Sequence, residues 1–117
     1  MPSHQFEDLE VWKRVAQLAV EVLKMVEGIK LYSLKDQMAR AAISVPSNIA
    51  EGAERDGDRE FARFLRIAKG SAGELRTQFY LGVRAGIINQ DIANTHINEL
   101  KEIGAMLQGL IRSLPND

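Results

Sequence analysis

The side chains in this sequence that could perform catalysis lack the neighbours that catalysis requires. His96 lies within an apolar helical stripe, where a histidine is more often a satisfied core or interface group than a base or a metal ligand. The only other histidine is His4, and the chain has no Glu-x-x-His pair of the kind that builds di-iron helix bundles. Ser44, Ser47 and Ser71 lie in helical patterns without a Gly-x-Ser-x-Gly elbow. We therefore expect neither a nucleophile nor a metal site.

The carboxylates are better explained as helix surface charge than as an acid and base pair. Glu51, Glu54, Glu60 and Glu74 have basic residues at helical spacing, as Glu51 has in Arg55. The chain contains no cysteine, which excludes disulfides, thiolate metal ligands and thiol catalysis. The sequence predicts a protein that is not an enzyme and has no cofactor.

Basic residues form a row along the segment 58–85, on the side opposite its large apolar residues. The members of this basic row are Arg59, Arg63, Arg66, Lys69, Arg76 and Arg84. Such a row can contact the phosphates of RNA or DNA, with strong salt dependence and little sequence specificity. On a single helix such a row is more often an ordinary solvated face. In a cyclic oligomer, symmetry would repeat the row and concentrate its positive charge.

The segment 34–53 has an apolar core stripe and, beside it, a line of polar residues that we call the polar seam. The seam consists of Gln37, Ser44, Asn48 and Glu51. Because buried polar groups need partners, a connected seam would fix helix register, and this structural role is favoured over ligand binding. Arg40, Arg55 and the polar side of the segment 58–85 are its candidate partners.

The same segment carries a second apolar face, on the side where a monomer would normally place charge. This outer face consists of Ala39, Ile43, Pro46 and Ala50. Pro46 removes one backbone hydrogen bond and usually kinks a helix. A helix with two apolar faces predicts contact with two neighbours, one of them another subunit.

Four segments with helical periodicity must position these groups, and we expect them at 8–27, 34–53, 58–85 and 89–113. Asp58 and Asn89 are the expected N-caps of the last two segments, and Ser33 with Asp36 resembles a capping box for the second. The apolar stripe of the fourth segment includes Ile92. No segment alternates like a strand, and no repeat or linker divides the 117 residues, so a single domain over 1–117 is expected. The apolar arc of the first segment exceeds half its circumference, more than a small monomer needs. The predicted fold is all-α, an antiparallel up-down four-helix bundle that self-associates into a ring.

Charge and hydropathy favour a cytoplasmic protein. The formal net charge of -1 gives no global attraction to nucleic acid or to an anionic membrane. No apolar run is long enough to cross a bilayer, and the first residues lack the pattern of a secretory signal. We expect no membrane contact.

Several ordered motifs, spread over nearly the whole chain, resemble the 23S rRNA intervening-sequence protein family. They are Phe6-x-x-Leu9-x-Val11-Trp12, Gln37-x-x-Arg40-Ala41-Ala42-x-Ser44-x-Pro46-x-Asn48-Ile49-Ala50-Glu51-Gly52, Glu60-Phe61-x-x-Phe64-Leu65-x-Ile67-Ala68-Lys69-Gly70-Ser71 and Glu74-Leu75-x-Thr77-Gln78. The resemblance implies a small bacterial four-helix-bundle protein that forms a homopentameric ring and has no known catalytic activity. Arg76 departs from the family, whose members often have an acid there, and it extends the basic row.

The resemblance also implies partners. The family is related to the accessory variability determinant protein of diversity-generating retroelements, in which a basic surface engages nucleic acid and the reverse transcriptase. The leading hypothesis is a non-enzymatic accessory protein that binds RNA or DNA through the basic row. The alternative is a structural scaffold, or a module for a protein partner such as a reverse transcriptase, that binds no nucleic acid.

Overall fold

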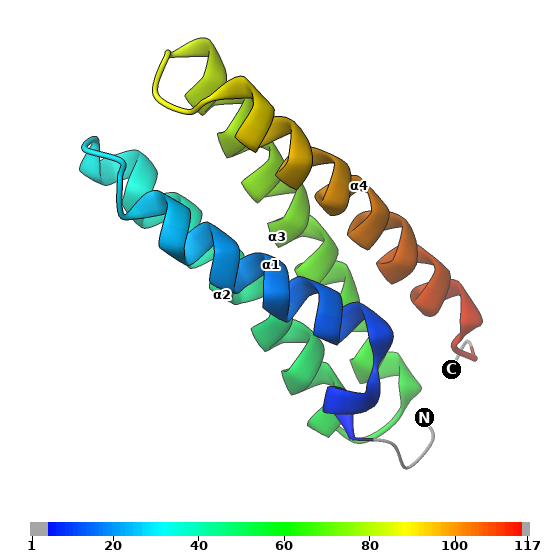
Figure 1. Cartoon of the computed structure of the whole chain (residues 1–117). Coiled ribbons are helices and arrows are strands. Elements are labelled where there is room, and N and C mark those ends of the chain that lie inside the picture. The colour runs from blue at the N-terminus through cyan, green and yellow to red at the C-terminus, as the bar shows by residue number, and fades with distance from the viewer. Residues whose placement is uncertain (1–4, 116–117) are drawn as a thin grey trace.

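The computed structural model describes residues 5–115 as four long helices preceded by one short turn. The elements are η1 (Phe6–Asp8), α1 (Glu10–Val26), α2 (Tyr32–Glu54), α3 (Asp58–Arg84) and α4 (Gln90–Ser113). Consecutive helices run in opposite directions along a bundle of 45 × 20 × 19 Å (Figure 1). The predicted all-α four-helix bundle is confirmed, whereas the 3₁₀ turn η1 was not predicted.

The ends of α3 and α4 show how local chemistry sets the helix boundaries. Asn89 caps α4 as predicted, because its side-chain oxygen accepts hydrogen bonds from the backbone N–H groups of Asp91 and Ile92 at 2.9 and 3.1 Å. The predicted cap at Asp58 is wrong, since Asp58 is the first residue of α3. The residue before it, Gly57, has a φ of 86°, which a glycine adopts without strain.

The start of α2 also differs from expectation. Ser33 and Asp36 were expected to form a capping box, but Ser33 lies inside the first turn and the N-cap is Leu31, which has no side-chain hydrogen bond to offer. The helix then continues without a break through Pro46 to Glu54. Packing against its neighbours therefore holds α2 together across the missing hydrogen bond of Pro46.

One continuous core runs the length of the bundle and receives side chains from every long helix. Its largest fully buried members are Val15, Val22, Met38, Val45, Ile49, Phe61, Leu65, Leu75, Phe79, Leu100, Ile103 and Leu107. Burying one such side chain stabilises the fold by roughly 1.5–3 kcal/mol. One member of the predicted stripe of α4, Ile92, is exposed, and Ala93 and Ile97 are buried near it.

The four helices are not packed equally tightly. The pair α2 and α3 is the closest, followed by α3 with α4 and α1 with α2, and α1 with α4 is the loosest. The bundle is therefore tight on three sides and more open on the fourth. Within residues 5–115, no helix is long and apolar enough to cross a membrane.

Candidate functional site

The structure divides the predicted basic row between two surfaces of α3. Arg59, Arg66 and Arg84 are exposed along the outer side of the helix, which is about 38 Å long between its first and last arginine at 1.5 Å per residue. Lys69 and Arg76 lie instead on the side of α3 that borders α4. The six residues therefore do not form a single stripe.

Within the basic row, Arg63 makes the most side-chain contacts. Its Nε and Nη2 donate to Glu60 at 3.0 and 3.3 Å, and its guanidinium lies 4.5 Å from the ring centroid of Phe64. The hydrogen bonds from Arg63 lower the pKa of the Glu60 carboxyl below its usual value. The guanidinium of Arg63 is thus engaged with Glu60 and Phe64, although the pair is exposed and contributes little to stability.

Lys69 and Arg76 meet Lys101 of α4 in a groove between the two helices, which we call the cationic groove. Its volume is about 250 Å³, and Ala72, Gly73, Leu100 and Gly104 complete its lining. Among residues 5–115, no acidic residue lines it. A Cβ built on Gly73 or Gly104 would meet nothing within 4 Å, so the backbone here is open to a ligand.

Among the described residues, none of the three cations of the groove forms an ion pair. Lys69 Nζ donates to the side-chain oxygen of Gln108 at 2.6 Å, and Gln108 is neutral. The groove therefore concentrates three positive charges from two helices on one concave surface.

The sequence analysis missed Lys101 because α4 was examined for its apolar stripe alone. A usable signal was present in the register of the α3 and α4 hairpin. Gly73 and Lys101 lie fourteen residues before and after Ile87 in the connecting loop, so antiparallel packing places them opposite each other.

The polar seam is connected only at its centre. Ser44 and Ser71 share a hydrogen bond of 2.8 Å between their hydroxyls, which links α2 to α3. The amide of Asn48 donates to the carbonyl and the hydroxyl of Ser44 at 2.8 and 2.9 Å. Gln37 is exposed, and Glu51 is exposed and accepts from Arg55 at 2.8 Å.

Arg40, a candidate partner of the seam, pairs elsewhere. Its Nε donates to Asp36 Oδ2 at 2.9 Å on the solvent side of α2. This hydrogen bond raises the pKa of Arg40 above its usual value. The seam is thus a local link between α2 and α3 at Ser44 and Asn48, and Gln37 and Glu51 lie outside that link.

The outer face of α2 lines a shallow apolar groove against α1, about 310 Å³ in volume. Ile43, Pro46 and Ala50 form one wall, and Ile43 is 49% exposed. Phe6 and Trp12 form part of the other wall, their ring centroids 5.1 Å apart in an edge-to-face contact. Ala39 does not line this groove and packs against the core.

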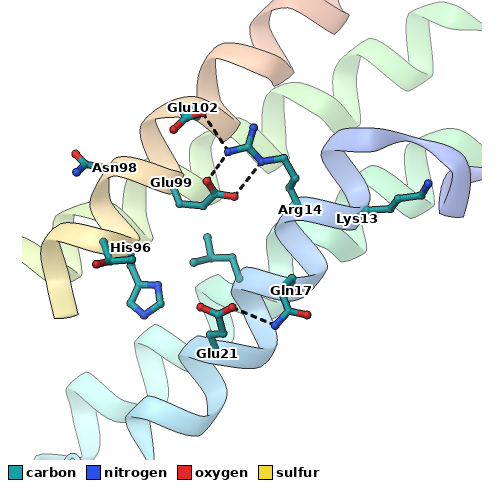
Figure 2. Close-up of a pocket in the computed structure, with 10 residues that line it drawn as sticks. Lys13, Arg14, Gln17, Glu21, His96, Asn98, Glu99 and Glu102 are labelled. Atoms are coloured by element: carbon teal, nitrogen blue, oxygen red, sulfur yellow. Dashed lines mark hydrogen bonds and ion pairs between the residues drawn. The ribbon is translucent and has the colours of Figure 1, made fainter.

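A larger groove of about 430 Å³ lies between the loosely packed α1 and α4 (Figure 2). Arg14 of α1 bridges it at one end, where its guanidinium donates to the carboxylates of both Glu99 and Glu102 of α4. These hydrogen bonds raise the pKa of Arg14 above its usual value. The bridge is the ionic link between the two helices that pack least closely.

His96 lies in the wall of this α1/α4 groove. Its side chain is buried as expected, and its ring lies 5.3 Å from the ring of Phe79. Burial lowers the pKa of His96 below its usual value, and the negative charge of Glu21 acts in the opposite direction. Neither ring nitrogen has a hydrogen-bond partner among residues 5–115, and the nitrogens border the open groove, where solvent can reach them.

Metal binding has no support in the described part of the chain. Within residues 5–115, no group of three or more His, Asp or Glu side chains is arranged to hold an ion. His4, the other histidine, lies outside the described residues.

Comparison with known proteins identifies the family. Residues 7–109 match the model of a family described as 23S rRNA-intervening sequence protein. A search of curated proteins found no match. A solved structure from Bacteroides thetaiotaomicron, described as a protein with unknown function from the S23 ribosomal protein family, has a TM-score of 0.85 at 22% identity and covers 88% of this chain and 99% of its own. That likeness supports the same fold, and the match over 7–109 shows that this chain belongs to the 23S rRNA-intervening sequence protein family.

Proposed function

We propose that this protein is a non-enzymatic accessory protein that binds single-stranded nucleic acid at the cationic groove of Lys69, Arg76 and Lys101. The observation that carries the proposal is the convergence of three unpaired cations on a groove without acidic lining. Lysine offers a phosphate a compact charge, and arginine offers a planar fork that can hold two phosphate oxygens. The open backbone at Gly73 and Gly104 leaves space for the phosphate chain.

An exposed aromatic side chain near the groove supports a single-stranded ligand. Tyr80 is 41% exposed and follows Arg76 by one turn of α3. The unpaired bases of a single strand can stack on such a ring, whereas the bases of a duplex are already stacked on one another. The exposed arginines of the basic row, above all Arg66 and Arg84, extend the positive surface along α3 and would add nonspecific attraction. The family name refers to 23S rRNA, which makes RNA the first ligand to test.

We further propose that the protein works as a homo-oligomeric ring, with five copies as the family resemblance implies. The apolar groove between α1 and α2 supports this proposal, because Ile43 is half exposed among Phe6, Trp12 and Pro46. When a second subunit covers apolar surface of this kind, its burial stabilises the assembly. A closed ring would carry one cationic groove per subunit, so several phosphates along one strand could be held together.

A second candidate function is a scaffold for a protein partner, such as a reverse transcriptase. The observation that favours it is an apolar groove of about 360 Å³ at the end of the bundle where α2 begins and α3 ends. Leu31 and Leu81 line it and are 52% and 56% exposed. A surface of this type is typical of a protein-binding site.

Titration of labelled single-stranded RNA and DNA at about 50 and 200 mM salt tests the leading proposal. We expect binding at the lower salt, a steep loss of affinity at the higher salt, and weaker binding by a Tyr80→Ala variant. Absence of binding at low salt would overturn the proposal. Binding of a protein partner without nucleic acid would then favour the scaffold.

A further inference from the structure

The α1/α4 groove contains an imidazole that has no hydrogen-bond partner among residues 5–115. His96 as a residue is 7% exposed, and its side chain points from α4 into the space between the two helices (Figure 2). Phe79 covers one face of the ring, but neither ring nitrogen has a hydrogen-bond partner among residues 5–115. The ring nitrogens border the open space of the groove, so a ligand that enters the groove can reach them.

A carboxylate without a cationic partner faces the same space from α1. Glu21 accepts one hydrogen bond from the amide of Gln17 at 3.0 Å, and among the described residues it forms no ion pair. Its negative charge is close enough to act on the pKa of His96. The groove therefore places the imidazole of His96, as a hydrogen-bond acceptor, near the carboxylate of Glu21, which has no cationic partner among the described residues.

The remainder of the groove has an apolar wall and a satisfied ionic bridge. Leu18 of α1 is buried and lines the groove near His96. The charge of Arg14 is occupied by Glu99 and Glu102, so the groove has little positive charge with which to hold an anion. Among the described residues that line the groove, the carboxylates Glu21, Glu99 and Glu102 outnumber the cations Lys13 and Arg14.

We propose that the α1/α4 groove binds a small organic cation, specifically a primary ammonium on an alkyl stem. The ammonium donates hydrogen bonds to the Glu21 carboxylate and to a ring nitrogen of His96, and the stem lies along Leu18. A neutral imidazole can accept such a hydrogen bond, and a carboxylate gives the charge-assisted one. The proposal does not depend on nucleic-acid binding, because no residue of the cationic groove takes part.

The groove is long enough for a second ammonium. Arg14 and Glu21 are separated by two turns of α1, about 10.5 Å, and Glu99 lies at the Arg14 end. A linear diamine with one ammonium at Glu21 would extend its other ammonium along the groove toward the Glu99 carboxylate. We therefore expect 1,5-diaminopentane to bind more tightly than n-pentylamine.

Nuclear magnetic resonance of the His96 ring tests the proposal directly, with the ring signals assigned by comparison with a His96→Ala variant. Titration with 1,5-diaminopentane is expected to shift the ring and Leu18 signals saturably and to lower the pKa of His96, because a bound cation opposes protonation. Glu21→Gln should weaken binding at least tenfold. Glu74→Gln, which makes the same charge change on exposed α3, should leave binding unchanged.

Three results would overturn the proposal. The first is no saturable shift at millimolar diamine. The second is equal binding of 1-pentanol, which would show that the groove takes any alkyl chain. The third is equal weakening by the Glu21 and Glu74 substitutions, which would show general charge attraction. Glu21 is exposed, so its substitution leaves the fold intact and keeps the test informative.

Discussion

Gly52 of α2 lies directly against Phe64 of α3, so closely that a Cβ built on Gly52 would be 2.6 Å from the Phe64 Cβ. Both residues are buried, and they lie on the two helices that pack most tightly. A Cβ of Phe64 cannot swing away as the tip of a flexible side chain can. The glycine that ends the run Gln37 to Gly52 therefore sets the distance between α2 and α3.

A Gly52→Ala variant is expected to lower the free energy of unfolding by about 1–2 kcal/mol. Overpacking of this kind typically costs 1–3 kcal/mol and outweighs the roughly 1 kcal/mol that alanine contributes inside a helix. Urea unfolding measures the change. Gly70→Ala is the matched control, because a Cβ there meets nothing within 4 Å and alanine should stabilise α3. Equal effects at both positions would contradict the close packing at Gly52.

The hydrogen bond between Ser44 and Ser71 should couple the two residues energetically. A double-mutant cycle with Ser44→Ala and Ser71→Ala is expected to give a coupling free energy of about 0.5–1.5 kcal/mol, because the hydroxyls lie 2.8 Å apart on different helices. Thermal unfolding of the four proteins measures it. The same cycle with Gln37→Ala in place of Ser44→Ala should give none, since Gln37 is exposed.

Stability should fall in weakly acidic solution because of His96. Burial lowers the pKa of His96 in the folded protein, whereas the unfolded chain binds this proton near pH 6.5. The contribution of neutral His96 to the free energy of unfolding is therefore present in full above pH 6.5, and it is lost as the pH falls toward the pKa of His96 in the folded protein. The slope reaches at most about 1.4 kcal/mol per pH unit.

Urea unfolding between pH 7.5 and 5 measures this slope. In a His96→Gln variant the slope over this range should become shallower, because the group that takes up the proton has been removed. An unchanged slope would show that other groups cause the acid sensitivity.

Charge on the outer face should disrupt self-association. Ile43→Glu places a carboxylate in the apolar groove beside Trp12, and we expect it to convert the oligomer into the 13.1 kDa monomer. Light scattering at micromolar concentration measures the mass, which for the parent protein should be five times that of one chain. Ile67→Glu is the matched control, because Ile67 is 41% exposed on α3 away from this groove. A monomeric parent protein would contradict the proposed ring.

Periodicity predicted the four helices because apolar residues at helical spacing must face a shared core. The cap at Asn89 was equally predictable, since asparagine before a helix accepts from the first N–H groups. The start of α2 was not, because Leu31 supplies no capping side chain and tertiary packing alone orders the turn there. Helix spacing also placed Ser44 and Asn48 correctly on one side of α2, although it could not select Ser71 as their partner.

The candidate site could be predicted only in part. The prediction of the basic row considered α3 alone. In the bundle, Lys69 and Arg76 lie on the side of α3 that borders α4, whereas the other arginines lie on its outer side. Lys101 enters the site because antiparallel packing brings a different segment opposite Gly73. The position of His96 in the wall of the α1/α4 groove depends on how loosely α1 packs against α4, which no pattern within one helix specifies.

The most direct test of the proposed function is the salt dependence of RNA binding by a Lys69→Gln/Arg76→Gln/Lys101→Gln variant. Its control is Lys13→Gln/Lys24→Gln/Lys30→Gln, which removes the same charge from α1 and the loop after it. We predict that the groove variant loses most of its affinity at low salt and that its slope of log K against log salt is shallower by about 2, as three phosphate contacts require. The control should keep nearly the slope of the parent protein. Equal losses in the two variants would show attraction by overall charge and would contradict a binding site at the cationic groove.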